Sequence, residues 1–358
     1  MVQSSLPKGG KAPRRRGKKG NTDRHSQEKV HKEARGEAFG VTESSGATYK
    51  PHKTLLVHLT EATPTWYECG RNSPGRDDSI FSLNADQGNS TIKSNSYGLV
   101  SKYRMLADSI YQQEVTLFRT SSSSDRDEQW VESTMKRGTL KDRIAAMSVV
   151  ISSNPVHKLY ALDMLLSLAG VSAGNTTNVT NTNERVAQMA AEALMDLFTN
   201  TLLPTTRKLI SLDARPLSIY DDGHEAKRNI SPRILLLWRF EEILKNKYSL
   251  FITQYLGRTL SQKSTSALDL TKITALRTAC TMLKDIPEGE QMLLSMVVNK
   301  IGDPSKKIAA AAGHELRRLL EAHSAMAMIV AREVRNVFLL HTCVFVHLAH
   351  FTILLISF

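Results

Sequence analysis

The chain has 358 residues, of which 41% are hydrophobic and 23% charged, a composition that suits a soluble protein with one large or two modest folded domains. Its formal net charge of +12 favours acidic partners, such as nucleic acid or an anionic membrane surface. The three cysteines lie far apart without any CxxC or Cys/His pair at zinc spacing, which argues against a disulfide framework and a structural zinc site.

The first forty residues are strongly basic, with eleven lysines and arginines against four acidic residues, so they supply +7 of the net charge. Glycine and proline interrupt the basic run, and no apolar periodicity passes through it. We predict a disordered basic arm over residues 1–60, which either targets the chain to the nucleus or nucleolus and contacts RNA phosphates, or is a solvated tail without a partner. The residues predicted to make these contacts are Lys11, Arg14, Arg15, Arg16, Lys18 and Lys19.

A polar linker is predicted over residues 61–97, because this stretch is rich in turn-forming residues. One short island, "PTWYECG", interrupts it. Its Trp66 and Tyr67 would be costly to leave in water, so we expect them to dock on a folded neighbour.

A helical period begins at Leu99 and predicts an α-helical domain over residues 98–335. Thr139 with Asp142 predicts a capped helix start, Gly170 a helix end, and Ser231 followed by proline another start. A serine-rich break is predicted between the first two helices, around residues 120–129. No strand-like alternation of useful length occurs, and about eight to ten helices are expected, which implies an all-α fold. Apolar residues at helical spacing on the first two helices and on the helix after residue 183 are predicted to face the core of the domain. They are Leu99, Tyr103, Leu106, Ile110, Leu117, Ile144, Met147, Ile151, Val186, Met189, Ala193, Leu194 and Leu197.

Two segments hint at an internal repeat: "KDRIAAMSVVI" at 141–151 and "KKIAAAAGHEL" at 306–316. Small residues in the second segment allow close packing against a preceding helix, as in HEAT-type inner helices. We therefore predict a HEAT or armadillo-like helical-repeat solenoid, with an irregular helical bundle as the alternative.

Sequence motifs for catalysis are missing: there is no GxxxxGK[ST], GxGxxG, HExxH or GxSxG. The best local candidate for metal or acid–base chemistry is "YDDGHE", residues 220–225, but an Asp-Gly surface turn explains it better. The unevenly spaced His341, His347 and His350 lack a carboxylate or cysteine partner for a metal site. We expect no catalytic residue, metal or cofactor, and hence no enzyme activity.

The helical body resembles a known family. The segments that carry the resemblance are "LVSKYRMLADSIYQQEVTLF", "GTLKDRIAAMSVVISSNPVHKLYALDMLLSL", "LLPTTRKLISLDARPL", "WRFEEILKNKYSLFI" and "ALRTACTMLKDIPEGEQMLLSMVVNKIGDPSKKIAAAAGHELRRLLEAH". These segments, together with the upstream "TWYE", resemble the CCAAT-binding-factor/nucleolar-complex-associated (Mak-type) family. The resemblance runs from Trp66 to Val334 and is poor between Gly70 and Tyr97.

This resemblance implies a HEAT-like solenoid of the nucleus and nucleolus that assists assembly of the large ribosomal subunit. The implied partners are pre-ribosomal RNA, a second nucleolar complex protein of the same pathway and precursor particles of the large subunit. The family name also implies an alternative role, regulation of transcription at CCAAT promoters. No helix, however, carries the concentrated Arg/Asn/Gln face of a base reader.

The segment 336–358, "NVFLLHTCVFVHLAHFTILLISF", contains no Asp, Glu, Lys or Arg. Its length suffices to span a bilayer, which would make the protein a membrane-tethered helical adaptor, but its β-branched and aromatic content suits a strand as well. Because the family-like sequence ceases just before it, we expect an aberrant C-terminus of a truncated chain, and we do not expect a membrane partner.

Overall fold

The computed structural model describes residues 51–59, 65–69, 97–122, 126–172, 183–218, 230–262 and 268–340. Residues 51–358 form one compact unit. Three of the sequence features lie outside the described residues: the six basic arm residues, the segment 220–225, and residues 341–358 with their three histidines.

The described residues form helices and turns and contain no strand, which confirms the predicted all-α class. The α-helices are α2 (Tyr97–Ser122), α3 (Arg126–Arg137), α4 (Leu140–Ser153), α5 (Leu159–Leu168), α6 (Glu184–Leu197), α8 (Pro232–Leu250), α9 (Arg258–Ser261), α10 (Asp269–Asp285), α11 (Glu290–Val298), α12 (Lys306–Ala322) and α13 (Ala327–Leu340). The described residues also form two π-helical segments, η2 (Phe198–Leu202) and η4 (Phe251–Gly257), and two short 3-10 turns, η3 (Leu212–Ala214) and η5 (Ser324–Met326).

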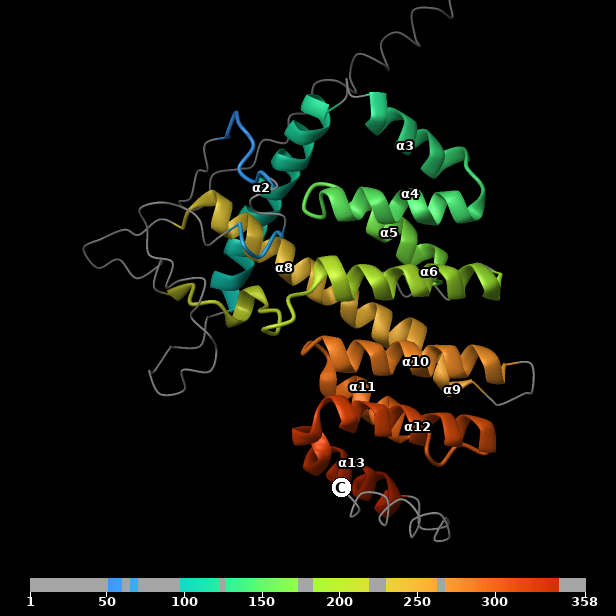
Figure 1. The fold of residues 1–358 in the computed structure, drawn as a ribbon. Helices are drawn as coiled ribbons and strands as arrows, with labels where there is room; N and C mark the ends of the chain where they lie inside the picture. The colour runs from blue at the N-terminus through green and yellow to red at the C-terminus, as the bar shows by residue number, and fades with distance from the viewer. Residues whose placement is uncertain are drawn as a thin grey trace, which may run out of the picture. The chain divides into compact units, whose positions relative to one another are not determined.

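Four helices form a stacked layer: α4, α6, α10 and α12 follow one another side by side, each packing on the next (Figure 1). Helices α5 and α11 lie in a second layer, α5 against α4 and α6, and α11 against α10 and α12. The two segments of the predicted repeat fall on α4 and α12, so they occupy the same layer of this stack. The arrangement is consistent with a helical repeat.

Local sequence signals set the helix ends where they were predicted. Thr139 caps α4, because its hydroxyl oxygen accepts a hydrogen bond from the backbone N–H of Asp142 at 3.3 Å. Gly170 ends α5 with a positive φ of 74°, which lets the Val171 N–H donate to the Leu166 carbonyl oxygen at 2.9 Å. Ser231 precedes Pro232 at the start of α8, where proline is favoured.

Helix α3 was not predicted, because a serine-rich break was expected in this region. It has little apolar character, and Met135 is its buried residue. Its charges nevertheless follow the helix dipole, with Asp127 and Glu128 in the first turn and Lys136 and Arg137 in the last. Charge order, rather than apolar periodicity, was therefore the signal for this helix.

The inward face of α2 differs from the predicted stripe. Ile110 is buried as expected, but Leu99, Tyr103, Leu106 and Leu117 are half-buried. The residues of α2 that the core covers are Val100, Ala107, Ile110, Tyr111 and Glu114. The helix is rotated toward Glu114 because that carboxylate has polar partners inside the fold. The stripe of α6 is closer to expectation: Val186, Leu194 and Leu197 are buried, whereas Met189 and Ala193 are half-buried.

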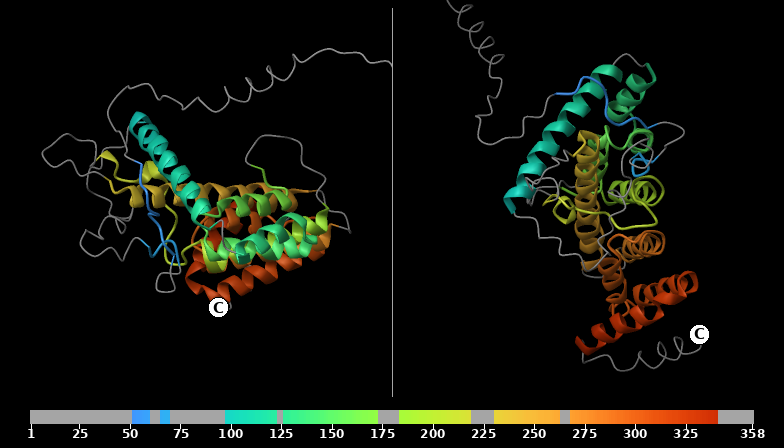
Figure 2. Two further views of the ribbon diagram at one scale, coloured as in Figure 1. Left: turned by 90° about the horizontal axis from the view of Figure 1, so that it is seen from above. Right: turned by 90° about the vertical axis from the view of Figure 1, so that its left-hand side faces the viewer.

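Helix α8 is buried on nearly all sides, and α2 crosses its N-terminal half (Figures 1 and 2). Trp66, the aromatic residue expected to dock on a folded neighbour, packs edge-on against Phe240 of α8 at 5.1 Å between ring centroids. Its indole N–H donates to the Leu202 carbonyl oxygen at 2.8 Å, and its side chain is fully buried. This expectation is confirmed, and the neighbouring Tyr67 is half-buried.

Helix α13 continues beyond the predicted boundary at residue 335, as far as Leu340. Within the part of the chain that the structure describes, no helix is long and apolar enough to cross a membrane.

Substitution of Gly289 by alanine tests the turn between α10 and α11. Gly289 has φ 71°, and a Cβ there would lie 2.8 Å from Ile252 Cδ1 and 3.2 Å from Tyr248 Cε1. We expect Gly289→Ala to lower the free energy of unfolding by about 2 kcal/mol, from left-handed strain and crowding combined. The measurement is urea denaturation followed by circular dichroism.

Gly302→Ala is the matched control, because a Cβ at Gly302 meets nothing within 4 Å. We expect it to change the free energy of unfolding by less than about 1 kcal/mol. Equal losses for the two variants would contradict the described turn.

Candidate functional site

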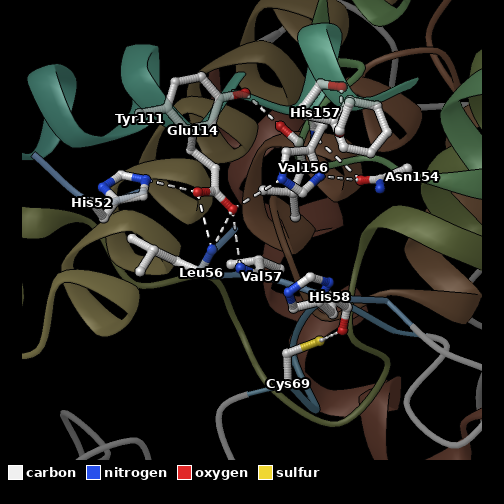
Figure 3. Close-up of polar contacts among 12 residues, drawn as sticks. His52, Leu56, Val57, His58, Cys69, Tyr111, Glu114, Asn154, Val156 and His157 are labelled. Carbon is white, nitrogen blue, oxygen red and sulfur yellow. Dashed lines mark hydrogen bonds and ion pairs between the residues drawn. The ribbon is translucent and has the colours of Figure 1, made fainter. Parts of the chain in front are cut away.

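The polar cluster around Glu114 joins segments that are far apart in the chain (Figure 3). Glu114 lies on the inward face of α2, and its side chain is fully buried. Its carboxylate accepts hydrogen bonds from the backbone N–H groups of Leu56 at 2.9 Å and Val57 at 3.0 Å. His52 Nε2 lies 2.9 Å from one carboxylate oxygen and His157 Nε2 lies 3.1 Å from the other.

His157 is held in place by its own contacts. Its Nδ1 lies 2.8 Å from Asn154 Oδ1, just after the end of α4, and its ring stacks on Phe118 with 4.3 Å between centroids. Close by, the Tyr111 hydroxyl of α2 donates to the Val156 carbonyl oxygen at 2.6 Å. The α4–α5 turn is therefore fixed to α2 by side chains on both sides of the cluster.

The environment stabilises the charged form of Glu114. Burial alone raises the pKa of this carboxyl, but the hydrogen bonds from His157, Val57 and Leu56 outweigh burial and hold the pKa below its ordinary value. Glu114 is therefore an ionised carboxylate at neutral pH, with its charge compensated by donors from two parts of the chain, residues 51–59 and the α4–α5 turn.

The geometry suits anchoring rather than chemistry. A carboxylate has about four acceptor sites, and four donor groups already approach Glu114. No group of three or more His, Cys, Asp or Glu side chains that could hold a metal ion occurs among the described residues. The cluster holds residues 51–59, the first described residues of the chain, on the helical body.

This anchoring corrects the predicted extent of the arm, which was expected to be disordered through residue 60. Residues 51–59 are instead held on the body, and the Val57 side chain is buried. The physical reason is the buried carboxylate of Glu114, which needs N–H donors and takes them from this segment.

A second polar cluster surrounds the adjacent Glu241 and Glu242 of α8. The carboxylate of Glu241 accepts from Arg207 at 2.5 Å, from Arg215 at 2.6 Å and from the Ile210 N–H at 2.9 Å. These bonds fix residues 207–215, an extended segment with one 3-10 turn, on α8. Burial and the neighbouring Arg207 lower the pKa of Arg215, Glu241 opposes them, and the net result is a pKa of about 10.

Glu242 joins α8 to α2. Arg104 of α2 donates to it at 2.6 Å and Arg239 of α8 at 2.5 Å, while Arg239 also binds Asp108 of α2 at 2.6 Å. Burial raises the pKa of Glu242, but the two guanidinium groups outweigh it and hold the pKa below its ordinary value. The crossing of α2 and α8 is therefore an ionic as well as an apolar contact.

None of the residues in these two clusters was predicted from the sequence. The six predicted arm residues and the segment 220–225 lie outside the described residues, so the structure places none of them. One signal was available for Glu114: it falls on the inward side of an amphipathic helix, where a lone carboxylate implies buried partners. Nothing local identified those partners, because His52 and His157 lie 62 and 43 residues away.

Comparison with known proteins gives several relatives, although no protein-family profile matches the chain. It is 33% identical over 248 residues to CCAAT/enhancer-binding protein zeta of Homo sapiens, which covers 69% of this chain and 22% of the relative. It is 26% identical over 296 residues to nucleolar complex protein 1 of Drosophila melanogaster, which covers 82% of this chain and 23% of that relative. It is 27% identical over 252 residues to ribosome biogenesis protein NOC1 of Chaetomium thermophilum, which covers 67% of this chain and 23% of that relative. The chain thus spans roughly a fifth to a quarter of the length of these curated relatives.

Replacement of Glu114 tests the anchor. Because the pKa of Glu114 is lower in the folded than in the unfolded chain, its contribution to stability is present above the unfolded-state pKa and is lost as pH falls through the folded-state pKa. We expect Glu114→Gln to lower the free energy of unfolding by about 2–3 kcal/mol at neutral pH and to flatten its decline in acid. Urea denaturation at a series of pH values measures both.

Glu132→Gln is the control, since Glu132 is a half-exposed partner of Lys136 on the surface of α3. Surface pairs contribute little, so we expect a change below about 1 kcal/mol. An acid slope in Glu114→Gln equal to that of the unmodified chain would contradict the anchor.

Proposed function

The chain belongs to the CCAAT-binding-factor/nucleolar-complex-associated family, and on that premise we propose that it is a non-catalytic assembly factor for the large ribosomal subunit. The observation that carries the proposal is the similarity to relatives named nucleolar complex protein 1 and ribosome biogenesis protein NOC1, which extends over 82% and 67% of this chain. The protein acts by binding precursor ribosomal RNA and proteins. It works in the nucleolus, on precursor particles of the large subunit, together with a second nucleolar complex protein.

The helical body supports this proposal as a scaffold. The two layers of stacked helices resemble a solenoid, and we assign them to a HEAT or armadillo-like repeat. In such a stack each helix contacts mainly its neighbours, so long outer faces remain available for partners.

The chemistry of the buried charges also supports binding rather than catalysis. Glu114, Glu241 and Glu242 each use their acceptor sites for hydrogen bonds within the fold. A general acid or base must reach a substrate, and these carboxylates are enclosed.

Sedimentation with RNA crosslinking tests the function. We expect the full-length chain to co-sediment with precursor particles of the large subunit and to crosslink to precursor rRNA. Replacing Lys11, Arg14, Arg15, Arg16, Lys18 and Lys19 by glutamine is expected to reduce the crosslinks and to flatten the salt dependence of RNA affinity, by roughly 0.7 in slope for each phosphate that the variant no longer neutralises.

A chain with residues 8–20 in scrambled order is the control, because it keeps every charge. We expect it to bind RNA like the unmodified chain, since phosphate attraction does not depend on residue order. Recovery of the unmodified chain only in free fractions, without rRNA crosslinks, would refute the assembly role.

A second candidate function is regulation at CCAAT promoters, favoured by the name of the human relative, CCAAT/enhancer-binding protein zeta. Sequence-specific DNA binding predicts tighter binding of a CCAAT duplex than of a scrambled duplex at physiological salt, whereas attraction to phosphates alone predicts equal affinities. Fluorescence anisotropy with the two duplexes separates these cases. We expect equal affinities.

A further inference from the structure

Helix α3 leaves a large aromatic side chain in water. Trp130 is 70% exposed, although the other two tryptophans of the chain, Trp66 and Trp238, are fully buried. An indole ring is among the most costly side chains to expose and is enriched where proteins bind ligands. Trp130 is therefore a candidate contact for a binding partner.

Trp130 forms part of a line of side chains along α3. Arg126, Trp130, Ser133 and Arg137 follow at helical spacing, so they lie within about 60° of one another around the helix axis. All four are exposed, and Met135, which is buried, points to the opposite side. We call these four residues the α3 stripe. Its two arginines are separated by about 16 Å along the helix.

The charges of the α3 stripe are not neutralised by α3's own acids. Glu128 accepts from Lys158 of the α4–α5 turn at 2.7 Å, and Glu132 pairs with Lys136 at 3.2 Å. Arg126 and Arg137 make no ion pair with any described carboxylate. Asp127 lies off the stripe, about a quarter-turn from Arg126. The stripe therefore presents two guanidinium groups beside an indole ring, without a carboxylate among them.

We infer that the α3 stripe binds single-stranded RNA, with an unpaired base stacked on Trp130 and phosphates of the same strand paired with Arg126 and Arg137. Stacking on an aromatic ring requires a base that is free of a duplex, and the guanidinium groups supply the charge complementarity to phosphate. This inference rests on the proposed function for the identity of the polyanion, and it adds a contact within the folded body to the one predicted for the arm.

A protein partner fits the α3 stripe less well. Tryptophan and arginine are also common at protein–protein hot spots, but there the anchor is surrounded by residues that exclude water. The other exposed residues of α3 are polar or charged: Asp127, Gln129, Glu132 and Lys136. This surface is polar, and its two arginines form no ion pair with any described carboxylate. It therefore suits a phosphate backbone better than it suits an apolar protein surface.

Fluorescence titration of the full-length chain with short single-stranded RNA tests the inference. Because Trp66 and Trp238 are fully buried, quenching by a stacked base reports on Trp130. We expect single-stranded RNA to quench the emission and duplex RNA to leave it unchanged. We expect Trp130→Ala to weaken single-strand affinity at least about fivefold, and Trp130→Phe, which keeps a stacking ring, to retain most of the affinity.

Two control variants match these changes elsewhere on the body. Tyr97→Ala removes an aromatic ring that is 88% exposed on α2, and Lys306→Gln with Lys307→Gln removes two exposed cations from α12. We expect Tyr97→Ala to change single-strand affinity less than about twofold. We expect the Lys306 and Lys307 double variant to weaken it less than Arg126→Gln with Arg137→Gln does. Denaturation midpoints equal to that of the unmodified chain verify that each variant is folded.

The outcomes separate this inference from the proposed function. If the arm variant loses RNA while Trp130→Ala keeps the RNA affinity of the unmodified chain, the stripe is not an RNA contact, although the assembly role stands. If Trp130→Ala keeps its RNA affinity but recovers fewer proteins from nuclease-treated extract, the stripe binds protein and the inference is refuted. If the unmodified chain binds no RNA, both proposals fail.

Discussion

The burial of two adjacent carboxylates in α8 is the constraint on which the packing of α2 and of residues 207–215 depends. Glu241 and Glu242 are almost fully enclosed, and an enclosed charge without a partner costs several kcal/mol. Their partners come from different places: Arg207 and Arg215 from the segment before α8, and Arg104 from α2. Helix α8 can therefore pack in its place only when both α2 and the segment 207–215 are present. This mutual requirement makes the crossing of α2 and α8 and the packing of residues 207–215 one cooperative event.

The same solution recurs where residues 51–59 and 207–215 meet the body. Glu114 binds the N–H groups of Leu56 and Val57, Glu241 that of Ile210, and Glu288 that of Leu209 at 2.7 Å. Segments without regular structure have no internal partners for their backbone groups, and a carboxylate on a neighbouring element supplies an acceptor. The carboxylates thus supply these segments with the hydrogen-bond partners that the stacked helices find within their own backbone.

These long-range pairs mark the boundary of what the sequence could predict. Signals that act over three or four residues were sufficient: the Thr139 cap, the Gly170 end and the start at Pro232 all lie where they were expected. The docking of Trp66 followed from its hydrophobicity, but its partner Leu202 is 136 residues away, and Phe240 lies further still. The rotation of α2 was missed because periodicity counts a carboxylate as outward-facing. Helix α3 was missed because its formation depends on charge order and on one buried methionine.

The shifted pKa values of the buried tyrosines and of Cys280 also have a structural explanation. Burial raises the pKa of Tyr111 and Tyr248, and both hydroxyls donate to backbone carbonyl oxygens, of Val156 at 2.6 Å and of Glu288 at 3.2 Å. Burial likewise raises the pKa of the Cys280 thiol to about 12, which keeps it protonated and unreactive. The pKa values of catalytic groups are shifted toward neutral pH, and such groups stay within reach of a substrate. The pKa values of these three groups are shifted away from neutral pH, and the groups are enclosed. This pattern favours a body in which the buried titratable groups serve stability.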